Sequence, residues 1–226
     1  MHLKDIKKDI PEKFYSVLEQ AGIDKLRPCQ EKAIHAGILK NKSVLICTPT
    51  ASGKTLTAEY AIIKAIENKG KAVYIVPLKS LATEKFKDFT KRYNGLIKTG
   101  ISIGDVDSPE PRLGDNNLIV ITAEKFDSLL RHNIQWLKYV NCVIVDEIHL
   151  LNDTDRGPTL EILITILRTL LKDIQIVGLS ATIGNPKELA NWLNAELVTD
   201  DWRPVELKQA VYLDGKIDYA TESKHF

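Results

Sequence analysis

The sequence predicts an α/β fold in which a mostly parallel, twisted sheet carries helices on both faces. Five apolar runs alternate with helix-compatible segments, at residues 44–47, 72–77, 118–122, 142–145 and 174–179. Continuous apolar runs are typical of strands buried on both faces of a parallel sheet. The first run breaks into small and polar residues that end in Gly53-Lys54-Thr55. This order of strand, loop and helix favours a phosphate-binding loop.

The other segments fit between these runs. Helices are expected at residues 11–21, 26–40, 56–67, 80–93, 123–131, 158–171 and 186–193, and weaker strands at 101–103 and 196–199. Asp, Pro and Gly between residues 105 and 117 indicate a surface loop. The alternation stops near residue 200. We therefore expect residues 1–199 to form one domain and residues 200–226 an exit segment, with no start of a new domain in 221–226.

Composition restricts the function classes. The chain has 226 residues, 44% hydrophobic and 27% charged, which suits one globular domain with a tail. Its net charge is +1, so any nucleic-acid contact must come from a local patch. Cys29, Cys47 and Cys142 fit no metal or redox spacing, which indicates a reduced, intracellular protein. No apolar run approaches the roughly 20 residues of a membrane span, and the charged N-terminus argues against a signal peptide.

The loop after the first apolar run has the residue types that phosphate binding requires. Small residues let N–H groups converge on phosphate oxygens, and the following helix adds its positive N-terminal end. Lys54 supplies a full charge for the β- and γ-phosphates, and Thr55 offers a hydroxyl to Mg²⁺. Thr48 stands where the common pattern has its first glycine, so an ordinary loop remains the alternative for this stretch alone. The predicted nucleotide contacts in it are Thr48, Pro49, Thr50, Ala51, Ser52, Gly53, Lys54 and Thr55.

Polar clusters follow directly after each apolar run, at residues 48–55, 77–80, 122–125, 146–149 and 180–182. The carboxyl ends of parallel strands meet at one edge of the sheet, where ligands bind. In one cluster, Asp146 can hold Mg²⁺ and Glu147 can take a proton from an attacking water. Two solvated acids at a strand end are the alternative. Beside Gly53-Lys54-Thr55, the pair predicts nucleotide hydrolysis.

As a set, these clusters resemble the motifs of superfamily 2 helicases. Residues 50–55, 146–149 and 180–182 resemble motifs I, II and III; residues 26–30 resemble the glutamine motif; residues 77–82 and 122–127 resemble motifs Ia and Ib. The Asp-Glu-Ile-His variant is similar to archaeal 3′→5′ DNA helicases of stalled replication forks and to their relatives fused to polymerase theta. Exosome-associated RNA helicases are cousins of that branch. The resemblance covers residues 10 to 210 and implies a RecA-like P-loop domain.

The resemblance implies roles for individual residues. Gln30 would bond the adenine of ATP, and Phe14 would either stack on the base or belong to the core. Thr55 and Asp146 would hold Mg²⁺, and Glu147 would be the general base, with Lys54 as the second catalytic residue. The residues that couple the nucleotide state to the strand and the partner domain would be His149, Ser180 and Thr182. The contacts to nucleic-acid phosphates would be Pro77, Lys79, Ser80, Thr122, Lys125 and Arg131.

The resemblance also implies binding partners, and two alternative functions remain open. These helicases bind ATP between two RecA-like domains, and nothing after Thr182 resembles the motifs of the second. We therefore expect the first motor domain of a 3′→5′ DNA helicase acting in repair or restart of stalled forks, unable to unwind alone. Its partners would be ATP, Mg²⁺, single-stranded or forked DNA, the second RecA-like domain and further helicase domains. It would lie in the cytoplasm at the nucleoid, or in the nucleus of a eukaryote. An RNA helicase and a non-catalytic nucleic-acid-binding module remain alternatives.

Overall fold

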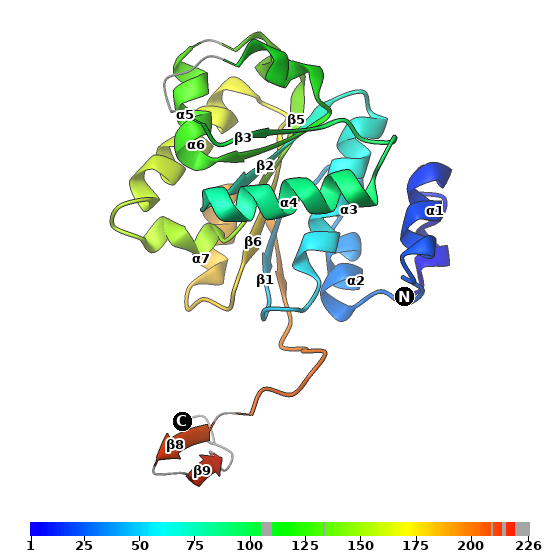
Figure 1. Ribbon diagram of the computed structural model, residues 1–226, viewed down its shortest axis with the longest axis vertical. Coiled ribbons are helices and arrows are strands. Elements are labelled where there is room, and N and C mark those ends of the chain that lie inside the picture. The colour runs from blue at the N-terminus through cyan, green and yellow to red at the C-terminus, as the bar shows by residue number, and fades with distance from the viewer. Residues whose placement is uncertain (105–109, 133, 209, 214–215, 220–226) are drawn as a thin grey trace.

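A seven-stranded parallel sheet forms the centre of the protein (Figure 1). The computed structural model describes residues 1–104, 110–132, 134–208, 210–213 and 216–219. The strands lie in the order β3-β4-β2-β5-β6-β1-β7, and every pairing among them is parallel. Their bounds are β1 (Val44–Cys47), β2 (Lys71–Val76), β3 (Thr99–Ser102), β4 (Leu118–Thr122), β5 (Val140–Val145), β6 (Gln175–Ser180) and β7 (Glu196–Thr199). The predicted fold class is confirmed.

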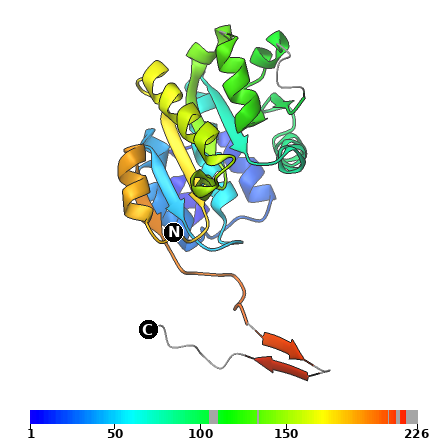
Figure 2. The same ribbon diagram turned by 90° about the vertical axis from the view of Figure 1, so that its left-hand side faces the viewer.

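Helices cover both faces of this sheet, as Figure 2 shows. They are α1 (Glu12–Gln20), α2 (Pro28–His35), α3 (Lys54–Glu67), α4 (Lys79–Arg92), α5 (Ala123–Arg131), α6 (Gly157–Leu170) and α7 (Pro186–Leu193). Side chains of α1 to α4 pack into one core layer with Val44 and Ile46, whereas α5 to α7 pack into the other with Leu45 and Cys47. Successive residues of a strand point into opposite core layers, so every residue of a central strand must be apolar. This explains the continuous apolar runs in the sequence.

Two predicted elements differ from the structure. The helix expected at 26–40 ends at His35 and is followed by a separate 3-10 turn, Ile38–Lys40. Gly37 lies between them with φ 96°, a left-handed conformation that terminates helices and suits glycine. The weak strand expected at 101–103 is β3, which begins two residues earlier and ends one residue earlier. Within the predicted 105–117 loop, Pro111–Asp115 form a 3-10 turn, and residues 105–109 lie outside the described part.

The chain leaves the domain from the carboxyl end of β7 and runs to a hairpin, β8 (Ala210–Leu213) and β9 (Lys216–Tyr219) (Figure 1). The sequence predicts only an exit segment over residues 200–226, so these two strands differ from the prediction. Residues 221–226 lie outside the described part. The boundary at 199/200 stays a proposal. Among the described residues, no helix is both long and apolar enough to cross a membrane.

Candidate nucleotide-binding site

The predicted phosphate loop connects β1 to α3 at the carboxyl edge of the sheet. Its first residue, Thr48, still belongs to the sheet ladder, because its N–H donates to the carbonyl of Ser180 at 3.3 Å. The Thr48 and Ser52 hydroxyls are hydrogen-bonded to each other at 2.8 Å across the loop. Thr48 therefore closes the loop through its side chain, and the missing first glycine does not prevent the turn.

Helix α2 holds three consecutive carbonyl groups of this loop. Arg27 Nη1, at the start of α2, donates to the Ala51 carbonyl at 2.5 Å, and the Cys29 thiol donates to the Ser52 carbonyl at 3.1 Å. Gln30 Nε2 donates to the Gly53 carbonyl at 3.3 Å. In a planar peptide the C=O and the next N–H point in opposite directions. The N–H groups of Gly53 and Lys54 therefore turn away from α2, toward the open side of the loop, where phosphate oxygens would bind.

Gly53 is required at its position for two reasons. Its φ of 104° lies in the left-handed region, where side chains are strained. A Cβ there would also lie 2.6 Å from Gln30 Nε2 and 3.0 Å from Arg27 Cδ. The glycine of the motif thus allows α2 to approach the loop closely.

The Lys54 ammonium lies across the open side of the loop. Its Nζ donates to the carbonyls of Thr48 and Pro49, at 2.7 and 3.1 Å. Burial lowers the pKa of Lys54, and the nearby carboxylates of Glu147 and Asp146 oppose that effect. A half-buried cation bonded only to neutral carbonyls is poised to exchange them for anionic oxygens, which bind a cation more strongly.

The acidic pair follows β5, two strands from the loop. Asp146 accepts hydrogen bonds at both carboxylate oxygens, from the Tyr74 hydroxyl at 2.9 Å and the Glu147 N–H at 3.0 Å. Burial raises the pKa of Tyr74, the Asp146 carboxylate raises it further, and a hydrogen bond with Thr55 opposes the increase. Tyr74 therefore lies between the two predicted Mg²⁺ ligands and orients the carboxylate.

These residues fit a magnesium ion that keeps water and phosphate ligands. No cluster of three or more His, Cys, Asp or Glu with metal-binding geometry occurs among the described residues. Mg²⁺ in nucleotide sites is commonly held by one or two protein oxygens and completed by phosphates and waters. Thr55 and Asp146 supply that smaller set.

Glu147 has a left-handed backbone, with φ 52° and ψ 44°. That conformation is unusual for a residue other than glycine, and such strain is common at functional positions. The Glu147 carboxylate is 40% exposed and lies 3.3 Å from His149 Nδ1. The carboxylate is thus open to solvent on one side and adjoins His149 on the other. Of the other predicted coupling residues, Ser180 is fully buried at the end of β6 and Thr182 is exposed.

A pocket of about 590 Å³ adjoins the loop on the α2 side. Its lining includes Gln30, Gly53, Thr55 and Glu59. Gln30 accepts a hydrogen bond from the Arg27 N–H at 2.9 Å, so both ends of its amide already have a partner. An amide retains one further donor hydrogen and one lone pair. The predicted adenine contact therefore remains a proposal. Phe14 is buried in the core and packs edge-on against Tyr93, so the core alternative holds in this structure.

The predicted nucleic-acid contacts separate into two groups. Pro77 is partly buried, while Lys79 and Ser80 are exposed in the first turn of α4, at the same edge as the loop. Thr122 is 5% exposed and caps α5 by accepting from the Lys125 N–H at 3.4 Å. Lys125 is 1% exposed and its Nζ lies 3.2 Å from Glu110 Oε1, so its ammonium is not presented to a phosphate here.

Arg131 ends α5 and is mostly exposed, paired with Asp127 at 2.7 Å. Lys79, Ser80 and Arg131 are thus exposed in this structure, whereas Thr122 and Lys125 are buried.

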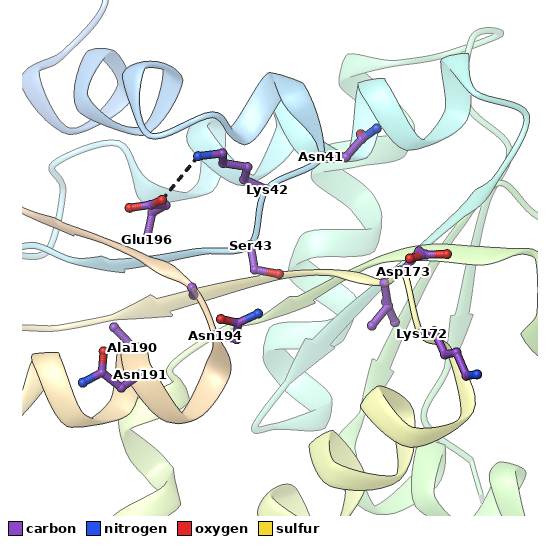
Figure 3. Close-up of a pocket in the computed structure, with 11 residues that line it drawn as sticks. Asn41, Lys42, Ser43, Lys172, Asp173, Ala190, Asn191, Asn194 and Glu196 are labelled. Atoms are coloured by element: carbon purple, nitrogen blue, oxygen red, sulfur yellow. Dashed lines mark hydrogen bonds and ion pairs between the residues drawn. The ribbon is translucent and has the colours of Figure 1, made fainter.

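A pocket larger than the one beside the loop lies elsewhere on the described part of the chain. Figure 3 shows this pocket, of about 760 Å³, with Asn41, Lys42, Ser43, Asp173 and Glu196 among its lining residues. These residues precede or begin β1, β6 and β7, so the pocket lies at the amino edge of the sheet. None of the predicted site residues lines it. Its size does not make it the functional site.

A parallel sheet of this order, with its phosphate loop at the carboxyl edge, is a RecA-like P-loop domain. The family model for DEAD/DEAH box helicases matches residues 27–189. The chain belongs to the DEAD/DEAH box helicase family.

Relatives and a solved structure agree with this assignment. ATP-dependent DNA helicase Hel308 from Methanococcus vannielii is 52% identical over 212 residues, which cover 90% of this chain and 28% of that protein. The Hel308 helicase from Pyrococcus horikoshii is 52% identical over 207 residues, which cover 91% of this chain and 28% of that protein. The crystal structure of the DUF1998 helicase MrfA is similar with a TM-score of 0.71 and 27% identity, over 84% of this chain and 33% of that one. The chain therefore spans about a third of the length of these proteins or less.

Several residues of the site were not identified from the sequence. Tyr74 lies in an apolar run, and its hydroxyl has a role only because β2 pairs with β5 and brings it beside Asp146. Arg27 and Cys29 lie inside the glutamine motif, but only the close approach of α2 to the loop shows what they hold. The one indication in the sequence is that the glutamine motif lies shortly before the loop in the chain, which favours contact between the two.

Proposed function

We propose that this chain is the first motor domain of an ATP-dependent DNA helicase with 3′→5′ polarity, which acts in repair or restart of stalled replication forks. The observation that carries the proposal is the arrangement around Lys54: a half-buried ammonium on the open side of the loop, with Asp146 and Glu147 close enough to act on its pKa. That arrangement is suited to a phosphate chain whose terminal group is attacked by water.

The roles follow from the positions of the side chains. The N–H groups of Gly53 and Lys54 and the Lys54 ammonium would bind and orient the phosphates. Thr55 and Asp146 would hold Mg²⁺, which bridges phosphate oxygens and neutralises charge that develops on them. Glu147 would accept a proton from the attacking water, since its carboxylate is partly exposed beside the site. His149 would orient that carboxylate.

The nucleic acid would cross the same edge, over the segments that follow β2 and β4. Lys79 and Ser80 at the start of α4, with Arg131 at the end of α5, would bind phosphates without reading bases. DNA is favoured over RNA because the relatives at about 50% identity are named DNA helicases. A second RecA-like domain and further domains would complete the site and the groove. The RNA alternative predicts stronger ATPase stimulation by single-stranded RNA than by DNA.

Calorimetric titration of ATP and Mg²⁺ into the parent chain and the Lys54→Ala variant tests the proposal. We expect the variant to lose measurable binding, because it removes the one full positive charge that the loop offers the phosphates. The Lys69→Ala variant, at an exposed position just after α3, serves as the lysine control. Equal affinity of a folded Lys54→Ala variant and the parent would sink the assignment.

A further inference from the structure

We propose that Arg27 is a positioning residue that couples nucleotide binding at the phosphate loop to docking of residues 200–202 on helix α2. The inference rests on the proposed ATP-binding function and adds a control element to it. Its basis is one guanidinium group in contact with both segments.

On the loop side, Arg27 Nη1 donates to the Ala51 carbonyl at 2.5 Å. Ala51 has φ 65°, a left-handed conformation that is unfavourable for a residue with a Cβ. A charged donor on the carbonyl of this strained residue stabilises the conformation that turns the neighbouring N–H groups toward phosphate. Without Arg27, Ala51 would relax toward an ordinary backbone geometry and the loop would no longer be preorganised.

On the other side, the same guanidinium lies 5.6 Å from the centre of the Trp202 ring. This distance is within the range of cation–π contacts. Trp202 is 38% exposed and lines a pocket of about 460 Å³ together with Arg27, Pro28, Lys32 and His35 of the α2 region. The ring is therefore docked against α2 and not free in solvent.

Further bonds fix the backbone that carries Trp202. Lys32 Nζ, on α2, donates to the Thr199 carbonyl at 2.8 Å and lies 2.8 Å from Asp200 Oδ2. Asp200 Oδ1 accepts from the Trp202 N–H at 2.6 Å. Partial burial opposes ionisation of Asp200, but the bonds from Lys32 and the Trp202 N–H outweigh it and lower the pKa of the carboxyl. The segment 199–202 is thus clamped to the helix whose first residues hold the loop.

Coupling follows from this shared residue. A ligand that stabilises the phosphate-binding form of the loop also stabilises the Arg27 conformation that donates to Ala51. In that same conformation the guanidinium contacts the Trp202 ring. By linkage, docking of Trp202 must raise nucleotide affinity by the same factor. The exit segment would then act on the loop through α2, and its release would weaken nucleotide binding.

The first test measures ATP affinity of the 226-residue chain by calorimetry with Mg²⁺. We expect Trp202→Ala to weaken binding by roughly two- to five-fold, the size of an exposed cation–π contact, and Arg27→Ala by roughly ten-fold or more. Arg27→Lys should recover part of the loss, since an ammonium can still donate to the Ala51 carbonyl. Val205→Ala, on the same segment and 77% exposed, is the matched control and should bind like the parent.

The second test uses the reciprocal effect. With 5-fluorotryptophan in the intact chain, the ¹⁹F resonance of Trp202, assigned by Trp202→Phe, should shift on addition of ATP in the parent and stay in place in Arg27→Ala. If Trp202→Ala binds ATP as tightly as Val205→Ala, or the Trp202 resonance does not respond in the parent, the coupling is refuted. Trp202 is at the surface, so its variant decides the matter even if Arg27→Ala fails to fold. Failure of the parent to bind ATP, or normal binding by Lys54→Ala, would instead refute the underlying ATP site.

Discussion

Replacing Arg92 by methionine should lower the free energy of unfolding, because it leaves a buried carboxylate between α3 and α4 without its charged partner. Glu59, on α3, is 1% exposed. Both of its oxygens accept from Arg92 Nη1 of α4, at 2.5 and 2.8 Å, and the Tyr93 hydroxyl donates to it as well. Burial raises the pKa of Glu59, and Arg92 and Tyr93 oppose that effect. The geometry is that of an ionised pair.

The size of the loss can be worked from the burial of the two partners. Breaking a buried pair by removing one partner commonly costs about 3–5 kcal/mol, because a charge is left uncompensated. Arg92 is 38% exposed at its side chain, so water already screens the guanidinium. We therefore expect about 2–3 kcal/mol at neutral pH, which lowers the Tm of a domain of this size by about 4–12 °C.

Urea and thermal unfolding followed by circular dichroism measure this loss. Arg131→Met, in an exposed pair, is the control and should cost less than about 1 kcal/mol. In Arg92→Met, Glu59 has a folded-state pKa raised above its unfolded value of 4.5, so the deficit should shrink as pH falls toward that value and grow as pH rises. Glu59→Gln combined with Arg92→Met should be more stable than Arg92→Met alone at neutral pH. A stability of Arg92→Met within error of the parent at pH 8 would refute the reasoning.

Three further predictions concern the nucleotide site. Gly53→Ala should fold but bind ATP at least ten-fold more weakly, owing to its left-handed φ and the Cβ contact with Gln30, whereas Gly22→Ala, also left-handed but with open space around its Cβ, should bind normally in the same calorimetric titration. Tyr74→Phe should raise the Mg²⁺ concentration needed for half-maximal ATP binding by roughly three- to ten-fold, because Asp146 loses an orienting hydrogen bond; an unchanged Mg²⁺ titration would contradict this role. Glu147→Gln should leave ATP binding within roughly two-fold and remove steady-state hydrolysis by the helicase, as an amide cannot take a proton; turnover equal to the parent would exclude Glu147 as the base.

The sheet was predictable because its physical cause is local in the sequence. A strand with helices on both sides must be apolar at every position, so each run predicts a central strand directly. The predicted end of α2 was wrong because the apolar pattern continues past Gly37, whereas the helical backbone ends before it. The hairpin of β8 and β9 was not predicted, since its strands are four residues each and its side chains at Val211 and Tyr212 are exposed. Such strands have no continuous apolar run to mark them.

The sequence also predicts which residues lie at the carboxyl edge of the sheet, because they follow the apolar runs directly. It does not predict which side chains contact one another there. Motif spacing places Lys79 and Lys125 after neighbouring strands, yet one is exposed and the other is buried against Glu110. Whether a lysine faces solvent depends on how distant segments pack over it. The same holds for Tyr74 and Arg27, whose partners are 72 and 24 residues away in the chain.

The strand order also sets how far a signal must travel inside this domain. The loop follows β1 and the start of α5 follows β4, with β6, β5 and β2 between them. Four steps of about 4.8 Å place these two points about 19 Å apart along the edge. The strands cannot slide to cover that span, because a slip of one residue would turn every buried side chain to the wrong layer. Any rearrangement inside this domain must therefore arise at the loops or between helices, because the sheet itself is a stiff frame.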